Sequence, residues 1–326
     1  MRSRILGKTG KRVSEIGLGC WQLGGEFGPI EDAQSLQVLE AATKENITFL
    51  DTADVYGAGR SEGLIGKHLQ SQSTKPFITT KVGRDGGLYP DKYNLDALRK
   101  NIEGSIARVG GEAFDLVQLH CVPKPVLEDG QIFEDMNILQ SEGLFDNWGA
   151  SVETIEEAEI CLEQEALASL QIIFNLFRQD AIESLLPKAK ASNVGIIVRL
   201  PLASGVLSGK YSADHEFAET DHRNFNKDGQ FFSVGETFSG IEFSKAVALA
   251  NELKQFVPEG MSLADMSLRW ILDQDAVTTI IAGCSRPEQV ERNARVSELP
   301  ALGEELNERL KTFYIENVRE HIRSSI

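Results

Sequence analysis

The 326-residue sequence has little cysteine and no long hydrophobic run. Its four cysteines are scattered and none forms a C-x-x-C pair: Cys20, Cys121, Cys161 and Cys284. This usage argues against a disulfide framework and predicts reduced thiols in a cytoplasmic protein. No segment approaches the roughly 18 uncharged apolar residues of a membrane span, and the first residues lack the apolar run of a secretory signal. We therefore expect no membrane association.

Positive charge is also scarce. Lys and Arg total 33 against 49 Asp and Glu, which gives a formal net charge of −16. Nucleic acids and anionic membranes both require a basic surface, so neither is expected as a partner. Hydrophobic residues at 41% and charged residues at 25% are typical of a globular protein with a large core.

Several well-known active-site motifs are missing. The sequence contains no Walker A loop, no G-x-S-x-G elbow and no H-E-x-x-H pair. Gly17 and Gly19 lack the third glycine of a dinucleotide-binding Rossmann fingerprint. No spacing of His, Cys and carboxylates suggests a zinc site, so no metal is predicted.

What the sequence does contain is a regular alternation of apolar runs and amphipathic helices. Continuously apolar runs are typical of parallel strands covered on both faces. Eight β/α units predict closure of the sheet, so we expect an α/β fold, a (β/α)8 TIM barrel forming one domain over residues 1–326. The eight predicted strands are Ile16–Leu18, Ile47–Leu50, Phe77–Thr80, Phe114–Leu119, Trp148–Val152, Leu170–Phe177, Gly195–Leu200 and Thr278–Ile281.

Two segments depart from this rhythm. Residues Arg4–Val13 contain a glycine turn and predict an N-terminal hairpin that could plug the floor of the barrel. Between the seventh and eighth strands lies an irregular insertion, Ser208–Glu236, which is more consistent with a functional flap than with a second domain. Its Phe225, Phe231 and Phe232 could close over a ligand.

Ionisable residues follow three consecutive predicted strands. Asp51, Lys81 and His120 end the second, third and fourth strands, and Tyr56 lies on the loop after Asp51. Active sites of barrels are built at this rim, so we expect the four side chains to meet there. Any one of them alone is more often a structural ion pair or a satisfied polar group; the joint pattern is what indicates a site.

The cluster has a chemical logic. The pKa of a tyrosine is normally about 10, and a nearby ammonium lowers it by favouring the phenolate. A carboxylate fixes the ammonium in place, and the phenol becomes a general acid able to protonate a carbonyl oxygen as a hydride arrives at carbon. A neutral histidine beside it can orient the carbonyl by a hydrogen bond.

These segments resemble the aldo-keto reductases, NADP-dependent carbonyl reductases built on a TIM barrel. The Asp51-x-Ala53-x-x-Tyr56-Gly57 block with its downstream Lys81 and His120 is highly specific. The resemblance covers nearly the whole chain, through segments Ile16–Gly24, Phe49–Gly57, Ile78–Lys81, Phe114–His120, Leu200–Tyr211 and Ile281–Asn293.

The resemblance implies that Tyr56 is the proton donor, that Lys81 and Asp51 tune it, and that His120 orients the substrate. It also implies an NADP(H) cofactor, with Arg286 near the adenosine 2′-phosphate, and a helix opening near Ser285 suits a phosphate. The implied cofactor contacts are Gly19, Trp21, Asp51, Ser151, Gln171, Arg199, Leu202, Ser204, Gly205, Leu207, Gly209, Lys210, Gly283, Ser285, Arg286, Gln289 and Asn293.

Two positions depart from the family pattern. Val152 replaces the asparagine that usually helps to hold the nicotinamide carboxamide, which leaves one hydrogen bond unaccounted for. Arg199 stands where an aromatic residue often stacks on the nicotinamide, and a planar guanidinium can also stack. We hypothesise that its positive charge disfavours NADP⁺ relative to NADPH.

The expected substrate contacts are Trp21, Tyr56, His120 and Trp148. Trp21, Trp148 and Phe174 could line an apolar pocket; ordinary core packing is the equally weighted alternative for all three.

The function predicted is NADPH-dependent reduction of a small-molecule aldehyde or ketone by a monomer or weak homo-oligomer. A Schiff-base aldolase using Lys81 and a slow, redox-sensing cofactor-binding subunit of the same superfamily are the alternatives.

Overall fold

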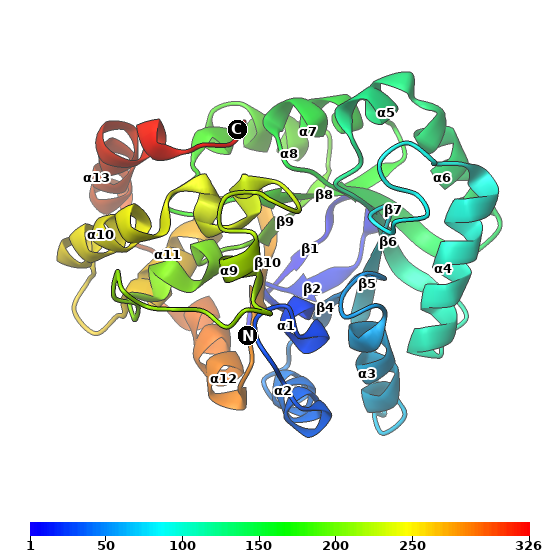
Figure 1. Cartoon of the computed structure of the whole chain (residues 1–326), viewed down its shortest axis with the longest axis horizontal. Helices are drawn as coiled ribbons and strands as arrows, with labels where there is room; N and C mark the ends of the chain where they lie inside the picture. Colours follow the sequence, from blue (N-terminus) through cyan, green and yellow to red (C-terminus); the bar gives the residue numbers. More distant parts are fainter.

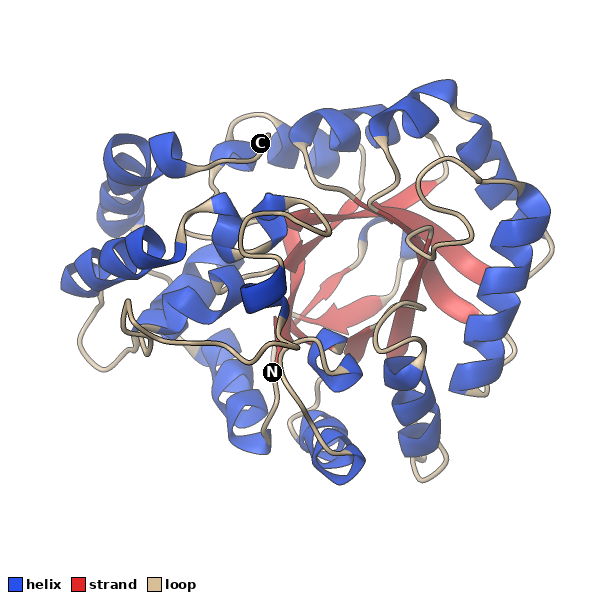
Figure 2. Ribbon diagram, in the orientation of Figure 1, coloured by secondary structure: helices blue, strands red, loops and turns tan.

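A closed barrel of eight parallel strands forms the centre of the computed structural model, which describes residues 1–326 (Figures 1 and 2). Each strand pairs with the next along the chain, and the last pairs with the first through Ile280 and Ile16. The predicted TIM barrel is confirmed. Its strands are β3 (Ile16–Gly19), β4 (Phe49–Asp51), β5 (Phe77–Val82), β6 (Phe114–His120), β7 (Phe145–Ser151), β8 (Leu167–Ile173), β9 (Gly195–Arg199) and β10 (Val277–Gly283).

The strands are apolar because they are covered on both sides. All seven residues of β8 and all five of β9 are buried. One predicted strand was placed too late: β8 ends at Ile173, whereas the prediction extended to Phe177. Phe174 and Phe177 are fully buried in the loop that follows, so their apolar character reflects packing and not strand structure.

Helices surround the barrel, as Figure 2 shows, and most follow one strand each. No helix has the length and apolar character required to cross a membrane. The helices are α1 (Trp21–Gly24), α2 (Asp32–Lys44), α3 (Arg60–Leu69), α4 (Leu95–Val109), α5 (Lys124–Asp129), α6 (Gln131–Ser141), α7 (Ile155–Leu162), α8 (Leu185–Ala191), α9 (His222–Phe225), α10 (Phe243–Leu253), α11 (Leu263–Leu272), α12 (Pro287–Arg295) and α13 (Glu304–Phe313).

Local signals at the helix ends explain several of these boundaries. The side chain of Asn94 accepts a hydrogen bond from the Ala97 backbone N–H at the start of α4, and Gly110 ends that helix with a positive φ of 77°. Such caps satisfy backbone groups that a helix leaves unpaired at its ends.

An N-terminal hairpin closes the floor of the barrel, as predicted. Strands β1 (Ser3–Ile5) and β2 (Arg12–Ser14) pair antiparallel, and Leu6 between them is fully buried. Gly7 has φ +45°, and a Cβ there would lie 2.3 Å from the backbone nitrogen of Gly195. Leu6 packs in a small cluster with Val13 and inward-facing strand residues: Phe49, Phe77, Leu116, Ile197 and Ile281.

Leu6→Ala is expected to lower the free energy of unfolding by about 2–5 kcal/mol, because it leaves a cavity in this cluster. The activity of the folded enzyme should persist, since the floor lies at the opposite end of the barrel from the strand ends that carry the predicted site. Ile5→Ala is the matched control: Ile5 is 53% exposed, so a change of no more than about 0.5 kcal/mol is expected. Denaturant unfolding measures both, and equal losses would contradict this account of the floor.

The chain between β9 and α11 includes the predicted insertion Ser208–Glu236 and lies along one side of the barrel mouth (Figure 1). It contains α9, α10 and four short 3-10 helices, Ala203–Ser208, Val234–Glu236, Phe238–Gly240 and Lys254–Phe256. The backbone N–H of His222 in α9 donates to the carbonyl of Glu26 at 2.9 Å. The His222 ring lies 4.6 Å from that of Trp21. The insertion is thereby attached to the loop after β3.

Candidate active site

Lys81 is the centre of the site, and its ammonium joins three groups. Its Nζ donates hydrogen bonds to Asp51 Oδ2 at 2.6 Å, to the Thr52 carbonyl at 2.9 Å and to Tyr56 Oη at 3.0 Å. Asp51 ends β4 and Lys81 lies near the end of β5, so neighbouring strands supply the pair. His120 ends β6, and its ring lies 5.9 Å from that of Tyr56. The four predicted residues therefore meet.

Tyr56 is positioned by a tight contact between two loops. The backbone N–H of Gly57 donates to Glu26 Oε1 at 2.7 Å. A Cβ on Gly24 would lie 2.7 Å from that same nitrogen, so glycine is required there. The ring of Trp21 stacks on Tyr56 with centroids 5.8 Å apart and planes 18° apart. Trp21 therefore forms one wall beside the phenol.

A buried amide layer holds Asp51. Gln171 Nε2 donates to Asp51 Oδ1 at 2.7 Å, and Gln118 Nε2 approaches the same atom at 3.3 Å. Both glutamines are buried. Gln118 was not predicted. The available signal was a lone glutamine inside the apolar strand Phe114–His120, because a polar residue in a fully buried strand needs a partner.

Burial sets the protonation of the site. It raises the pKa of Tyr56 to about 12, and although Lys81 lowers this pKa as predicted, burial outweighs it. Burial alone would lower the pKa of Lys81, but Asp51 and Tyr56 raise it, and the net shift is upward. Burial, followed by the charges of Arg84 and Lys81, lowers the pKa of His120 well below its usual value. Near neutral pH the site therefore holds a protonated phenol, an ammonium and a neutral imidazole.

A pocket of about 210 Å³ opens above these residues. Most of the predicted site residues line it: Gly19, Trp21, Asp51, Tyr56, His120, Gln171, Arg199, Leu202, Ser204, Gly205, Lys210, Gly283, Ser285 and Gln289. Lining residues that were not predicted include Gln22, Phe27, Arg84, Tyr211, Arg223 and Glu236. Arg223 and Glu236 belong to the insertion, which therefore supplies part of the wall.

Trp148 does not contribute to this pocket, so its predicted contact with substrate is wrong. It is fully buried, stacks on Phe133 of α6 at 5.8 Å, and donates from Nε1 to Asn137 Oδ1 at 3.0 Å. It therefore faces the helix layer outside the barrel. Phe174 likewise stacks on Trp270 in the core.

Five further predicted cofactor contacts lie outside the pocket wall. Leu207 is fully buried, and Gly209 ends the 3-10 helix Ala203–Ser208 with φ 71°. Ser151 Oγ donates to Gln171 Oε1 at 3.4 Å, and Asn293 Nδ2 donates to Cys284 Sγ at 3.3 Å. Arg286 is exposed at the start of α12.

The side chain of Gln289, in the first turn of α12, caps the start of that helix. Gln289 Oε1 accepts hydrogen bonds from the backbone N–H groups of Ser285 at 2.8 Å and Arg286 at 3.0 Å. The Pro287 that follows has no N–H to satisfy and suits the first helical position. Gln289 therefore has a structural partner as well as a place in the pocket wall.

Beside His120 lies a charged cluster that sequence reasoning largely missed: Arg84, Glu153, Arg199 and Glu236. Arg84 Nη2 donates to Glu236 Oε1 at 2.5 Å and to Glu153 Oε1 at 2.9 Å, and its Nη1 donates to Glu236 Oε2 at 3.1 Å. Arg199 Nη1 lies 3.4 Å from Glu236 Oε2, and its Nη2 donates to the Val152 carbonyl at 3.0 Å.

This pairing revises our hypothesis that the charge of Arg199 discriminates between NADPH and NADP⁺. Arg199 shares the carboxylate of Glu236 with Arg84, so the charge that faces the pocket is that of the whole cluster and not of Arg199 alone. The sequence offers one signal for Arg84, its place three residues after Lys81. Glu236 offers no comparable signal in the sequence.

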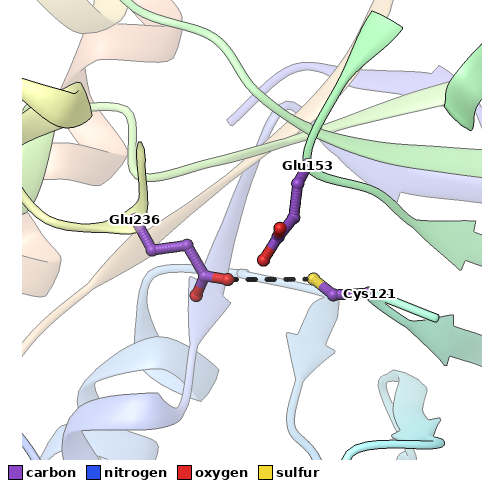
Figure 3. Close-up of side chains that lie close together, drawn as sticks. All are labelled: Cys121, Glu153 and Glu236. Atoms are coloured by element: carbon purple, nitrogen blue, oxygen red, sulfur yellow. Dashed lines mark hydrogen bonds between the residues drawn. The ribbon is translucent and has the colours of Figure 1, made fainter. Parts of the chain in front are cut away.

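The cluster does not form a cation site. Ligand atoms of Cys121, Glu153 and Glu236 lie within 4.8 Å of one another, and Figure 3 shows the three side chains pointing toward one another. Both carboxylates, however, are already occupied by Arg84. Burial raises the pKa of the Cys121 thiol to about 12, which leaves it protonated and a poor metal ligand.

Comparisons with known proteins agree with this geometry. The aldo/keto reductase family model matches residues 15–315. Aldo-keto reductase YhdN of Bacillus subtilis is 28% identical, covering 91% of this chain and 89% of that protein. A protein of Oryza sativa named "probable voltage-gated potassium channel subunit beta" is 28% identical, covering 95% and 96%. The glycerol dehydrogenase structure from Gluconobacter oxydans superposes with a TM-score of 0.78 and 26% identity, over 99% and 97% of the two chains. The chain therefore belongs to the aldo/keto reductase family.

Proposed function

We propose that the protein reduces an aldehyde or ketone to the alcohol, with NADPH as hydride donor and Tyr56 as proton donor. The observation that carries the proposal is the contact of Lys81 Nζ with both Tyr56 Oη and Asp51 Oδ2 beneath a pocket that His120 also lines. A protonated phenol next to a fixed ammonium is suited to giving up its proton, because the ammonium stabilises the resulting phenolate.

The residues that line the pocket support binding of a dinucleotide. Its lining includes Tyr56 and His120 together with Ser285 and Gln289 at the start of α12, and Lys210 adds a positive charge to the wall. Arg199 Nε is a buried donor without a protein partner, as expected of a group awaiting a ligand oxygen. Bound NADPH would supply the hydride that reaches the carbonyl carbon.

The residues of this chain would act as follows. The neutral His120 orients the carbonyl oxygen by a hydrogen bond, and Tyr56 Oη gives that oxygen its proton. Lys81 stabilises the phenolate that remains, and Asp51 holds Lys81 in place. The rings of Trp21 and Phe27 restrict water on the same side of the pocket.

The proposal is tested by following deuterium from the cofactor to the product alcohol. NADPH deuterated at the reactive carbon of the nicotinamide, incubated with a panel of aldehydes and ketones, should yield alcohols with deuterium on the former carbonyl carbon. An enzyme that consumes no NADPH with any member of the panel would contradict the proposal. Borohydride trapping of a substrate on Lys81 would instead support the aldolase alternative.

Arg286 is proposed to select NADPH over NADH by contacting the 2′-phosphate. Arg286→Gln is expected to raise the KM for NADPH by about 10- to 100-fold, the value of a hydrogen bond to a charged group, with little change for NADH. Arg292→Gln is the matched control, because Arg292 is also exposed on α12. Steady-state kinetics with both nucleotides measure the effect. Equal changes for NADPH and NADH would remove Arg286 from this role.

A second candidate function is a slow, cofactor-binding redox sensor. The 28% identity to the named potassium channel subunit favours it. Turnover separates the two: enzymes typically have kcat of about 1 s⁻¹ or more. A bound nucleotide oxidised far more slowly by every carbonyl compound would support the sensor.

A further inference from the structure

The carboxylates that line the pocket, Asp51 and Glu236, are already paired with protein donors. Glu236 Oε1 accepts from Arg84 Nη2 and contacts Cys121 Sγ at 3.9 Å, and its Oε2 accepts from Arg84 Nη1 next to Arg199. Asp51 is occupied by Lys81 and by the amide layer. A ligand rich in hydroxyl donors would therefore find these acceptors taken.

Donors, in contrast, remain free in the same region. Arg84 has five N–H groups, of which three are used, on Glu236 twice and on Glu153 once. The Nε–H and one N–H of Nη1 have no protein partner, and the side chain is 18% exposed where it lines the pocket. Arg199 Nε adds a buried donor without a partner. The ligand expected here offers acceptor oxygens.

The local charge favours an anion. Glu153 and Glu236 lie too close to ionise independently, and burial followed by the charge of Glu236 raises the pKa of Glu153 to about 8. Burial alone would raise the pKa of Glu236, but Arg84 and Arg199 hold it well below its usual value. Near neutral pH, two guanidinium groups therefore face one carboxylate. Lys81 and Asp51 cancel each other, and His120 is neutral, so one positive charge is in excess.

We propose that the substrate is an aldehyde or ketone that also carries a carboxylate, which Arg84 binds while the carbonyl lies between Tyr56 and His120. This inference rests on the proposed function. In the reaction the carbonyl carbon receives a hydride from NADPH and its oxygen a proton from Tyr56; the carboxylate is unchanged. Arg84 acts as a specificity-determining residue, because the planar guanidinium matches a carboxylate.

The test compares para-formylbenzoate with its methyl ester, which differ in charge but not in the reacting aldehyde. The ratio of their kcat/KM values should favour the carboxylate in the wild-type enzyme, and Arg84→Gln should lower that ratio about 100-fold. A ratio that is the same in both proteins overturns the inference. If the wild type reduces other carbonyl compounds but not para-formylbenzoate, the inference is likewise overturned; if it reduces no carbonyl compound at all, the proposed function fails instead.

A pH profile of the wild-type enzyme tests the same idea without any variant. As pH rises from about 7 to about 9, Glu153 ionises and cancels the excess charge, so the ratio should fall several-fold. The groups facing Glu153 are Arg84, Arg199, Glu236, Cys121 and, against its backbone, Arg178 and Glu157. The pKa of Cys121 lies near 12 and that of Glu236 well below neutrality, so neither titrates in this range.

Glu153→Gln is the control variant, since it keeps the neutral form at every pH. Its ratio should match the wild type near pH 7 and stay constant to about pH 9. Binding gives a readout independent of turnover: benzoate should quench tryptophan fluorescence more strongly than benzamide does, through Trp21, because Trp148 and Trp270 are buried. A flat wild-type profile, or equal quenching, overturns the inference.

Discussion

Tyr56→Phe is expected to lower kcat by about 10³-fold, within the usual range for a general acid. The phenol is the one group in the pocket that combines a proton at neutral pH with contact to a fixed ammonium at 3.0 Å. Removal of the hydroxyl leaves the hydride step without a proton for the developing alkoxide. Single-turnover oxidation of NADPH measures the effect on the chemical step.

The matched control is Tyr93→Phe. Tyr93 also has a hydrogen-bonded hydroxyl, which donates to the Gly83 carbonyl at 2.9 Å, but it does not line the pocket. Less than a threefold change in kcat is expected there. NADPH binding, followed by fluorescence, should be preserved in Tyr56→Phe. Near-normal turnover by Tyr56→Phe would mean that another group, or water, supplies the proton.

Lys81→Met should damage both activity and stability. The ammonium lowers the pKa of Tyr56, so its loss makes the phenolate harder to form and kcat should fall by at least about 10²-fold. It also leaves Asp51 buried with only the two glutamine donors. An uncompensated buried charge typically costs about 3–5 kcal/mol of unfolding free energy. Denaturant unfolding and steady-state kinetics measure the two effects.

The double variant Asp51→Asn with Lys81→Met separates these effects. It removes both charges, so most of the lost stability should return, while activity stays low because no ammonium faces Tyr56. If the double variant is as unstable as Lys81→Met alone, the instability does not arise from the unpaired carboxylate. If activity returns with stability, Lys81 serves only the fold.

The parts of the site predictable from sequence were those with a local signal. Asp51, Lys81 and His120 end consecutive strands, and parallel strands bring their ends to one rim. Arg84 and Glu236 lie 152 residues apart and meet only because the insertion returns to the barrel mouth. No periodicity or spacing connects such a pair before the fold is known.

Trp148 illustrates a second limit. Successive residues of a strand face opposite sides of the sheet. Where a strand has one face in solvent, polar residues identify that face, but β7 is buried on both sides from Trp148 to Ser151. Composition therefore cannot tell an inward tryptophan from an outward one. A shift of one residue in the facing pattern transfers a side chain from the pocket to the helix layer.

The cluster around Leu6 allows the stability of the protein to be changed separately from the chemistry of the pocket. The Leu6 cluster is separate from the main hydrophobic core, and Ile281 is its one member that also lines the pocket. Substitutions at distant sites with no shared partners usually have additive free energies. Stabilising changes around Leu6 should therefore offset costly changes at the rim without altering chemistry. Stabilising substitutions should therefore be introduced in the hairpin before the pocket is redesigned for other carbonyl compounds.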